Sequence, residues 1–252
     1  MPVYDEPRYY EIAFSFVDIE SQINLFHAFI EEHSKRVVKR VLDIGCGPAQ
    51  QLREMVKRGY EGVGLDRSPE MLGYLAEKAE EEGITIETVQ ADMTDFQLDK
   101  KVDFSFILMG TIALIESRDK FLSHIDSVAG SMKSGGLYLI ENMKLNWTSD
   151  DFFGSQSWTM EKDGVRVETT YSVELNDALA QMLKETMTMK VDDQGKHTVL
   201  EETTETRMIF PQEFITLVEL RGKFEFLGWF ERSSTLRLTG ASPDNITLLR
   251  RR

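Results

Sequence analysis

The stretch Val41–Gln50, VLDIGCGPAQ, constrains the fold of this chain more than any other. It reads as a buried strand that runs directly into a turn made with Gly45 and Gly47. In open α/β sheets such turns lie at the carboxyl ends of the strands, where the backbone can approach a ligand closely. The stretch therefore predicts an α/β domain with a small-molecule site at this turn.

Apolar runs and helical patterns alternate through the first 142 residues. After the first strand, strand-like runs are expected at 62–66, 84–91, 101–110 and 134–142. Patterns with helical spacing occupy 19–35, 53–60, 67–83 and 117–133. This alternation predicts βαβ units with right-handed crossovers around a mostly parallel sheet.

The pattern changes after Trp147. Apolar and polar residues alternate with period two from Val165 to Leu175, apolar residues continue over 183–191, and 197–210 forms a third strand-like run. An antiparallel β-meander of about 45 residues is therefore expected as an insertion. A helix from Pro211 to about Arg221 and strands at 224–230 and 245–251 then return to the main sheet.

Composition narrows the classes of protein. Lys and Arg number 29 and Asp and Glu number 43, giving a net charge of −14, which disfavours binding to nucleic acid or to anionic lipid. No apolar run reaches the roughly 18 residues of a membrane span. The single cysteine, Cys46, allows no intrachain disulfide, so we expect a cytoplasmic protein.

The glycine turn does not fit a dinucleotide. A dinucleotide loop needs a third glycine for close packing of the helix on the strand, and Gln50 stands at that place. Asp43, two residues before Gly45, would repel a diphosphate and suits a ligand that carries positive charge. An NAD(P)-dependent oxidoreductase is therefore the less favoured alternative.

Residues 36–142 resemble the class I S-adenosylmethionine-dependent methyltransferases, in motifs and in their order. VLDIGCGPAQ matches the family's first motif, hydrophobic-x-Asp/Glu-x-Gly-x-Gly, although Ala49 stands where glycine is frequent, so we expect a tighter loop. Four further stretches resemble the second to fifth strands with their loops: GVGLDRSPEML, QADMTDF, VDFSFILMG and MKSGGLYLIEN. The resemblance implies a doubly wound, seven-stranded Rossmann-like sheet and S-adenosylmethionine as cofactor.

The resemblance also implies roles for residues in these motifs. Asp43 and the backbone of Gly45, Cys46 and Gly47 would hold the methionine end of the cofactor, Asp66 the ribose, and Asp92 with Met93 the adenine. Tyr10, in a tyrosine-rich lead-in, would close over the cofactor, and Arg67 is a candidate for the adenine edge, with a solvated side chain as the alternative. Met109 and Gly110 end the fourth strand at the same sheet edge. Cys46 has no histidine base beside it in the sequence and is expected to pack under the loop.

The acceptor side has weaker signals. Glu141 and Asn142, at the end of the fifth strand, are the candidates for acceptor contacts, with an ordinary strand end as the alternative. Trp147 and Tyr171 are further candidates for the wall of an acceptor pocket. The sequence presents no catalytic residue and no spacing of metal ligands.

The expected organisation has three parts. Residues 1–35 form an N-terminal helical lid, 36–146 with 208–252 the cofactor-binding domain, and 147–207 the insert. The insert either covers the acceptor pocket or forms a subunit contact, as in a homodimer. The predicted activity is methyl transfer to nitrogen or oxygen of a small metabolite, and a non-catalytic S-adenosylmethionine-binding protein remains the main alternative.

Overall fold

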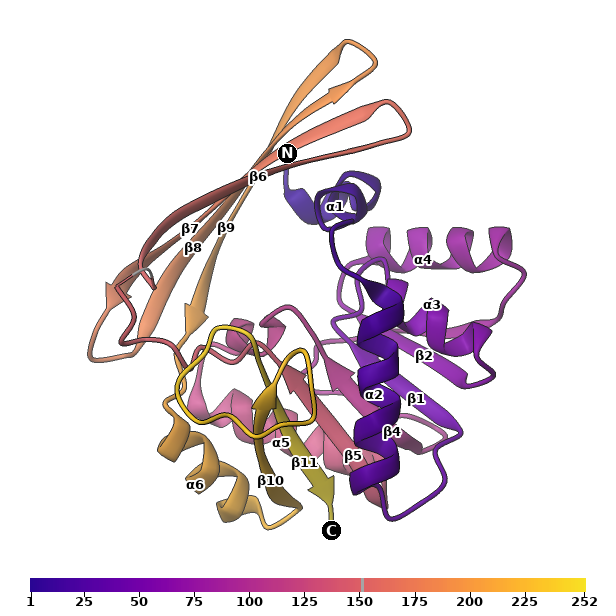
Figure 1. Cartoon of the computed structure of the whole chain (residues 1–252), viewed down its shortest axis with the longest axis vertical. Helices are drawn as coiled ribbons and strands as arrows, with labels where there is room; N and C mark the ends of the chain where they lie inside the picture. The colour runs from indigo at the N-terminus through magenta and orange to yellow at the C-terminus, as the bar shows by residue number, and fades with distance from the viewer. Residues whose placement is uncertain (151) are drawn as a thin grey trace.

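A seven-stranded sheet forms the centre of the molecule (Figure 1). The computed structural model describes residues 1–150 and 152–252. The strands lie in the order β10-β11-β5-β4-β1-β2-β3, and all neighbours are parallel except that β11 runs antiparallel to β10 and β5. Their bounds are β1 Arg40–Ile44, β2 Glu61–Asp66, β3 Ile86–Gln90, β4 Val102–Ile107, β5 Met132–Glu141, β10 Phe224–Glu231 and β11 Asn245–Arg251. The predicted mostly parallel seven-stranded sheet is confirmed.

Helices cover both faces of this sheet. One face packs against α2 (Ile19–His33), α3 (Gln50–Lys57) and α4 (Pro69–Glu81), and the other against α5 (Arg118–Ser131) and α6 (Pro211–Arg221). The central strands β1 and β4 are buried along their whole length, as expected for strands covered on both faces. None of the helices in the described part of the chain is long and apolar enough to cross a membrane.

The insert is a separate antiparallel sheet that extends away from the main domain (Figure 1). Its strands are β6 (Gly154–Lys162), β7 (Val165–Asp177), β8 (Met182–Asp193) and β9 (Lys196–Arg207), in sequence order. Three of them were expected, and β6 was missed. Most residues of β6 are exposed, so this strand lacks the apolar alternation that identified β7.

The N-terminal segment divides into two parts. α2 places Ile23, Phe26 and Phe29 in the core against the main sheet. The preceding elements, η1 (Val3–Asp5) and α1 (Pro7–Ala13), pack instead against the apolar face of the insert, and α1 lies between that sheet and α4 (Figure 1). Residues 1–18 are thus the part of the expected lid that covers other elements.

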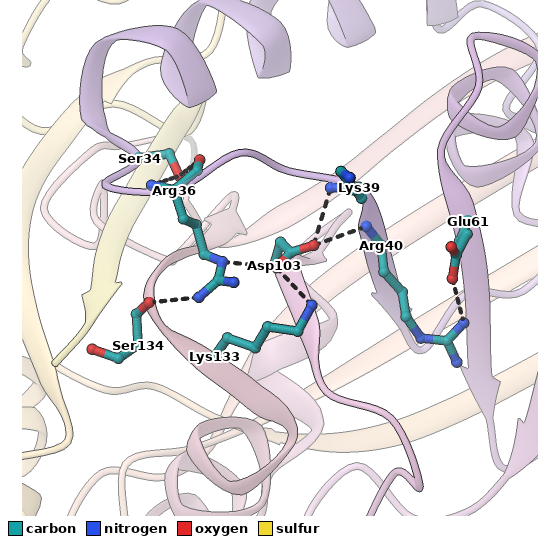
Figure 2. A network of polar contacts seen from close by, with 8 residues as sticks. All are labelled: Ser34, Arg36, Lys39, Arg40, Glu61, Asp103, Lys133 and Ser134. Atoms are coloured by element: carbon teal, nitrogen blue, oxygen red, sulfur yellow. Dashed lines mark hydrogen bonds and ion pairs between the residues drawn. The ribbon is translucent and has the colours of Figure 1, made fainter.

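Asp103, at the start of β4, is the centre of a polar network at the amino ends of the central strands (Figure 2). Its carboxylate accepts hydrogen bonds from Arg36 Nε at 2.7 Å, Lys133 Nζ at 3.0 Å and the backbone N–H groups of Lys39 and Arg40 at 3.0 and 3.1 Å. Burial alone would raise the pKa of Asp103, but these donors lower it. At this edge the Asp103 carboxylate thus joins two cationic side chains and the backbone that enters β1.

Candidate functional site

A cavity of about 480 Å³ opens at the carboxyl ends of β1, β2 and β4. Its volume lies in the range of roughly 300–1,000 Å³ that small-molecule sites occupy. The walls come from the loop between β1 and α3, the ends of β2, β3 and β4, the short helix η2 (Thr111–Leu114), the N-terminal segment and one residue of β9. The cavity therefore lies where open α/β sheets bind their ligands.

The glycine loop forms the floor of this cavity. Gly45 and Gly47 have positive φ angles of 65° and 50°, which glycine adopts without steric cost. A Cβ atom on Gly45 would lie 2.8 Å from Cγ2 of Thr111, so the opposite wall approaches closely here. Ala49, just before α3, also has a left-handed backbone, with φ 54° and ψ 40°. The loop thus keeps a glycine-like conformation at a residue with a side chain.

Asp43 reaches the cavity from β1 and is almost fully buried. Among residues 1–150 and 152–252 its carboxyl group has no hydrogen-bond partner, in contrast to Asp103. Burial, with the nearby Asp66 and Glu141 carboxylates, raises the pKa of Asp43 well above its ordinary value. A ligand that brings a positive charge or a donor would relieve this unfavourable position.

Asp66 ends β2 and also lines the cavity. Its carboxylate accepts from the backbone N–H of Gly47 at 2.8 Å and of Ser68 at 2.9 Å, which joins the glycine loop to the start of α4. The adjacent Arg67 is exposed at the cavity wall. Asp66 therefore fixes the loop geometry while its remaining lone pairs can face a ligand.

Asp92 and Met93 follow β3 at the neighbouring wall. Asp92 accepts from the backbone N–H and the hydroxyl of Thr94, at 2.7 and 2.6 Å, and the hydroxyl of Thr94 is the first of the causes that lower its pKa. His124 Nδ1 lies 2.8 Å from the Met93 carbonyl oxygen, and its Nε2 lies 2.7 Å from the hydroxyl of Tyr138. Since a carbonyl only accepts, His124 donates from Nδ1 and accepts at Nε2. His124 is thus a buried packing residue that supports this loop.

Tyr10 lines the cavity from α1 together with Phe14, whose ring centre lies 4.7 Å from that of Tyr10. Sequence reasoning missed Tyr4 beside them. Burial, with the charge of Glu202 on β9, raises the pKa of Tyr4 to about 12, so its hydroxyl stays protonated at neutral pH. Glu202 was also missed, because only the packing of β9 against η1 reveals which residue of the insert faces the cavity.

The structure brings the expected cofactor residues together with one exception. The cavity is lined by Tyr10, Asp43, Gly45, Cys46, Gly47, Asp66, Arg67, Asp92, Met93 and Met109, while Gly110 lies outside the lining. Burial raises the pKa of the Cys46 thiol well above its ordinary value, which fits a packing residue better than a nucleophile. No group of three or more metal-ligating side chains occurs over residues 1–150 and 152–252.

The acceptor candidates lie outside the cavity lining. Glu141 is buried and accepts from Gln22 Nε2 at 2.5 Å, the backbone N–H of Met109 at 2.9 Å and Arg232 Nε at 2.7 Å. Its neighbour Asn142 has a φ of 56°, and its backbone N–H donates to the Asn245 carbonyl. In this state both residues tie the end of β5 to neighbouring elements.

Trp147 and Tyr171 are likewise not among the residues that line the cavity. Trp147 is 41% exposed and packs edge-to-face on Phe210. The Tyr171 hydroxyl donates to Glu185 on β8, which also forms an ion pair with Lys144. This cluster joins the insert to the loop after β5.

The charge of the lining selects among ligands. Eight carboxylates line the cavity, against the two basic side chains Arg67 and Lys120: Asp5, Glu11, Asp43, Asp66, Glu70, Asp92, Glu116 and Glu202. Lys120 forms an ion pair with Glu116 at 2.7 Å. Such a cavity disfavours a pyrophosphate and suits a cationic ligand, so the residues present fit a sulfonium donor with an α-ammonium group.

Comparison with known proteins gives the domain type. Residues 41–136 match the family model of a methyltransferase domain. A provisionally named methyltransferase of Geobacillus sp. (strain WCH70) is 26% identical over 112 residues, 44% of this chain and 45% of that protein. The ubiquinone biosynthesis O-methyltransferase of Actinobacillus pleuropneumoniae is 31% identical over 101 residues, 39% of this chain and 43% of that protein. The chain thus spans less than half the length of these two relatives.

Similarity to solved structures extends over nearly the whole chain. An S-adenosylmethionine-dependent methyltransferase from Clostridium acetobutylicum superposes with a TM-score of 0.78 at 16% identity, covering 96% of this chain and 95% of that one. A sugar N-methyltransferase from Streptoalloteichus sp. superposes with a TM-score of 0.73 at 17% identity, covering 93% and 88%. The insert is therefore included in the shared fold.

Proposed function

Because residues 41–136 form a methyltransferase domain and the whole chain has the class I methyltransferase fold, we propose that this protein transfers a methyl group from S-adenosylmethionine to a small molecule. The observation that carries the proposal is the buried, unpaired Asp43 carboxyl group beside the glycine loop. A carboxylate there favours a cationic donor over a dinucleotide. The family match and the cavity lining support the same cofactor.

In the proposed complex the loop residues 45–47 and Asp43 hold the methionine end of the cofactor. Asp66 accepts hydrogen bonds from the ribose hydroxyls, Asp92 accepts from the adenine amino group, and Met93 packs on the ring. Tyr10 covers the bound molecule from α1. These assignments extend what the sequence resemblance implies to side chains that share one cavity.

S-adenosylmethionine, when bound, would supply a methyl group on a positively charged sulfur, and the neutral thioether would be the leaving group when the acceptor atom bonds to the methyl carbon. The contribution of the chain is to orient the two reactants and to exclude water, and holding reactants in register can supply roughly 7–11 kcal/mol. The aromatic side chains of Tyr10 and Phe14 provide the water-excluding cover. A general base is needed only where the acceptor atom must lose its proton.

We propose nitrogen or oxygen of a small metabolite as the acceptor. The cavity is a recess of small-molecule size, and the net charge of −14 disfavours a nucleic-acid substrate. The names of similar proteins state such acceptor atoms: one is a sugar N-methyltransferase and another a ubiquinone biosynthesis O-methyltransferase. The lone buried Cys46 supports a reducing, cytoplasmic setting.

Calorimetric titration with S-adenosylhomocysteine tests the cofactor assignment. We expect binding to the unaltered protein, and a loss of about tenfold or more in affinity for Asp66→Ala, because hydrogen bonds to a charged group contribute about 1.5–3 kcal/mol. Glu77→Ala, an exposed change on α4, serves as the control. Tight binding of NAD in place of S-adenosylhomocysteine would refute the proposal.

Turnover distinguishes an enzyme from a non-catalytic binder. Purified protein with S-adenosylmethionine is screened against small amines and hydroxyl compounds for release of S-adenosylhomocysteine. An enzyme releases product only with its acceptor class. Binding without release across the whole panel would favour a regulatory or assembly role.

A further inference from the structure

Glu11, on α1, is the most heavily bonded acidic residue of the N-terminal segment. It is 8% exposed. One carboxylate oxygen accepts from Gln50 Nε2 at 3.0 Å and forms an ion pair with Arg53, and the other accepts from the Tyr74 hydroxyl at 2.5 Å. Gln50 and Arg53 belong to α3 and Tyr74 to α4, so a single carboxylate joins three helices.

The same short helix performs two other contacts. Ile12 and Ala13 pack against the apolar face of the insert, and Trp158 of β6 donates to the Ala13 carbonyl at 2.8 Å. Tyr10 and Phe14 face the cavity. Thus α1 covers the cavity, contacts the insert on one side and is held by Glu11 to the main domain on the other.

Gln50 gives this arrangement a direct connection to the glycine loop. It is the first residue of α3 and follows the loop at the position where a dinucleotide-binding protein needs glycine. Because this loop does not have the third glycine of a dinucleotide-binding loop, the residue at position 50 carries a side chain, which donates to Glu11. The residue that excluded a dinucleotide therefore connects the loop to the helix above it.

We propose that Glu11 is a positioning residue for the methyl-transfer site: its carboxylate clasps α1 onto α3 and α4 and thereby sets how long a bound donor stays covered. The identity of the covered ligand rests on the proposed function. The contacts of Glu11 that hold α1 on α3 and α4 do not depend on it. A partly buried carboxylate with an arginine partner and two neutral donors is a strong, directional contact. In this proposal a ligand covered by Tyr10 leaves when α1 moves, and that movement breaks the contacts of Glu11.

Arg53 provides a matched control, since it has a second acidic partner outside the N-terminal segment. Its Nη1 lies 2.5 Å from Glu82 Oε1. Glu82→Gln removes one charge partner of Arg53 while α1 keeps its clasp. Glu11→Gln removes the other partner and also places an amide donor against Arg53 and Gln50.

Hydrogen exchange of the ligand-free protein tests the clasp itself. We expect the α1 amides of Glu11→Gln to exchange about tenfold faster or more than in the unaltered protein, with a change below about threefold for Glu82→Gln. Tyr74→Phe, which removes a single donor, is expected to act in the same direction by a smaller factor. It provides the measurement if Glu11→Gln fails to fold. Unchanged exchange in α1, or equal acceleration by Glu82→Gln, would overturn the latch.

Dissociation of S-adenosylhomocysteine tests the consequence for the site. Stopped-flow release from Glu11→Gln is expected to be about tenfold faster, with the association rate changed much less, because interface contacts act mainly on dissociation. Equal release rates in Glu11→Gln and the unaltered protein would refute the positioning role. If the unaltered protein binds no S-adenosylhomocysteine, the proposed function fails, and the exchange result still decides whether Glu11 is a latch.

Discussion

Two buried aspartates in neighbouring strands show how differently one sheet treats the same side chain. Asp103, at the start of β4, accepts hydrogen bonds from two cationic side chains and two backbone N–H groups (Figure 2). Asp43, near the end of β1, is equally buried but has no partner for its carboxyl group within the described part of the chain. The pKa of Asp103 is lowered and that of Asp43 is raised.

The difference separates stability from function. The amino edge of the sheet satisfies its buried charge internally, so this charge contributes to folding. The carboxyl edge leaves its buried charge unsatisfied, which costs folding energy and prepares the edge for a cationic ligand. Asp103→Ala and Asp43→Asn test this contrast, and the pH dependence of stability tests a third buried titratable side chain, His124.

The largest effect is expected from Asp103→Ala. The change leaves the N–H groups of Lys39 and Arg40 without their acceptor and separates Arg36 and Lys133 from their shared carboxylate. Arg36 and Lys133 are 30% and 39% exposed and regain water, so we expect a loss near the lower end of the range for broken buried pairs, about 3 kcal/mol. Urea unfolding at pH 7 measures it. A loss below about 1 kcal/mol would contradict a stabilising role for this edge.

An intermediate effect is expected from acid acting on His124. Burial lowers the pKa of His124 to about 4, below its ordinary value of 6.5. In the unfolded chain His124 therefore becomes protonated below about pH 6.5, whereas in the folded chain it stays neutral down to about pH 4. Stability falls as the pH drops through this window. Between pH 7 and 5 this loss amounts to about 2 kcal/mol.

His124→Asn removes the buried imidazole and therefore isolates its contribution to the pH dependence of stability. Urea unfolding at pH 7 and pH 5 should have a smaller pH dependence in this variant than in the unaltered protein. His197→Asn, at an exposed position, should keep the original dependence. Identical pH dependence in all three proteins would show that the buried imidazole is not linked to folding.

The smallest effect on stability, with the opposite sign, is expected from Asp43→Asn. The raised pKa of Asp43 means that ionisation opposes folding at neutral pH, so the neutral amide should stabilise the protein. Affinity for S-adenosylhomocysteine should fall by about tenfold or more, because the change removes the carboxylate that we propose as the partner of its ammonium group. Asp103→Asn should lower stability and leave this affinity nearly unchanged. If both asparagine variants destabilise equally, the contrast between the two edges is wrong.

The sequence alone determined the architecture of the main domain and the composition of one wall of the site. Strands such as β1 and β4 are mostly apolar and buried along their length, and helices with their own start and stop residues separate the strands, so local pattern and packing agree. Asp43, Asp66 and Asp92 lie at or just after the carboxyl ends of β1, β2 and β3, and parallel strands bring these ends to one edge. These residues converge on one cavity because the alternating strand and helix patterns of the sequence already imply a parallel sheet.

Only the tertiary structure decided which residues face that cavity from elsewhere. Tyr4 and Glu202 are far apart in the chain and carry no local signal, and their shared position follows from the packing of η1 against β9. Glu141 was a candidate for an acceptor contact or for an ordinary strand end. In the structure Gln22 and Arg232, from distant elements, both donate to its Oε1. The sequence pattern of a strand indicates which face of the strand is buried. The partners of a polar group depend on long-range contacts that no short window of sequence contains.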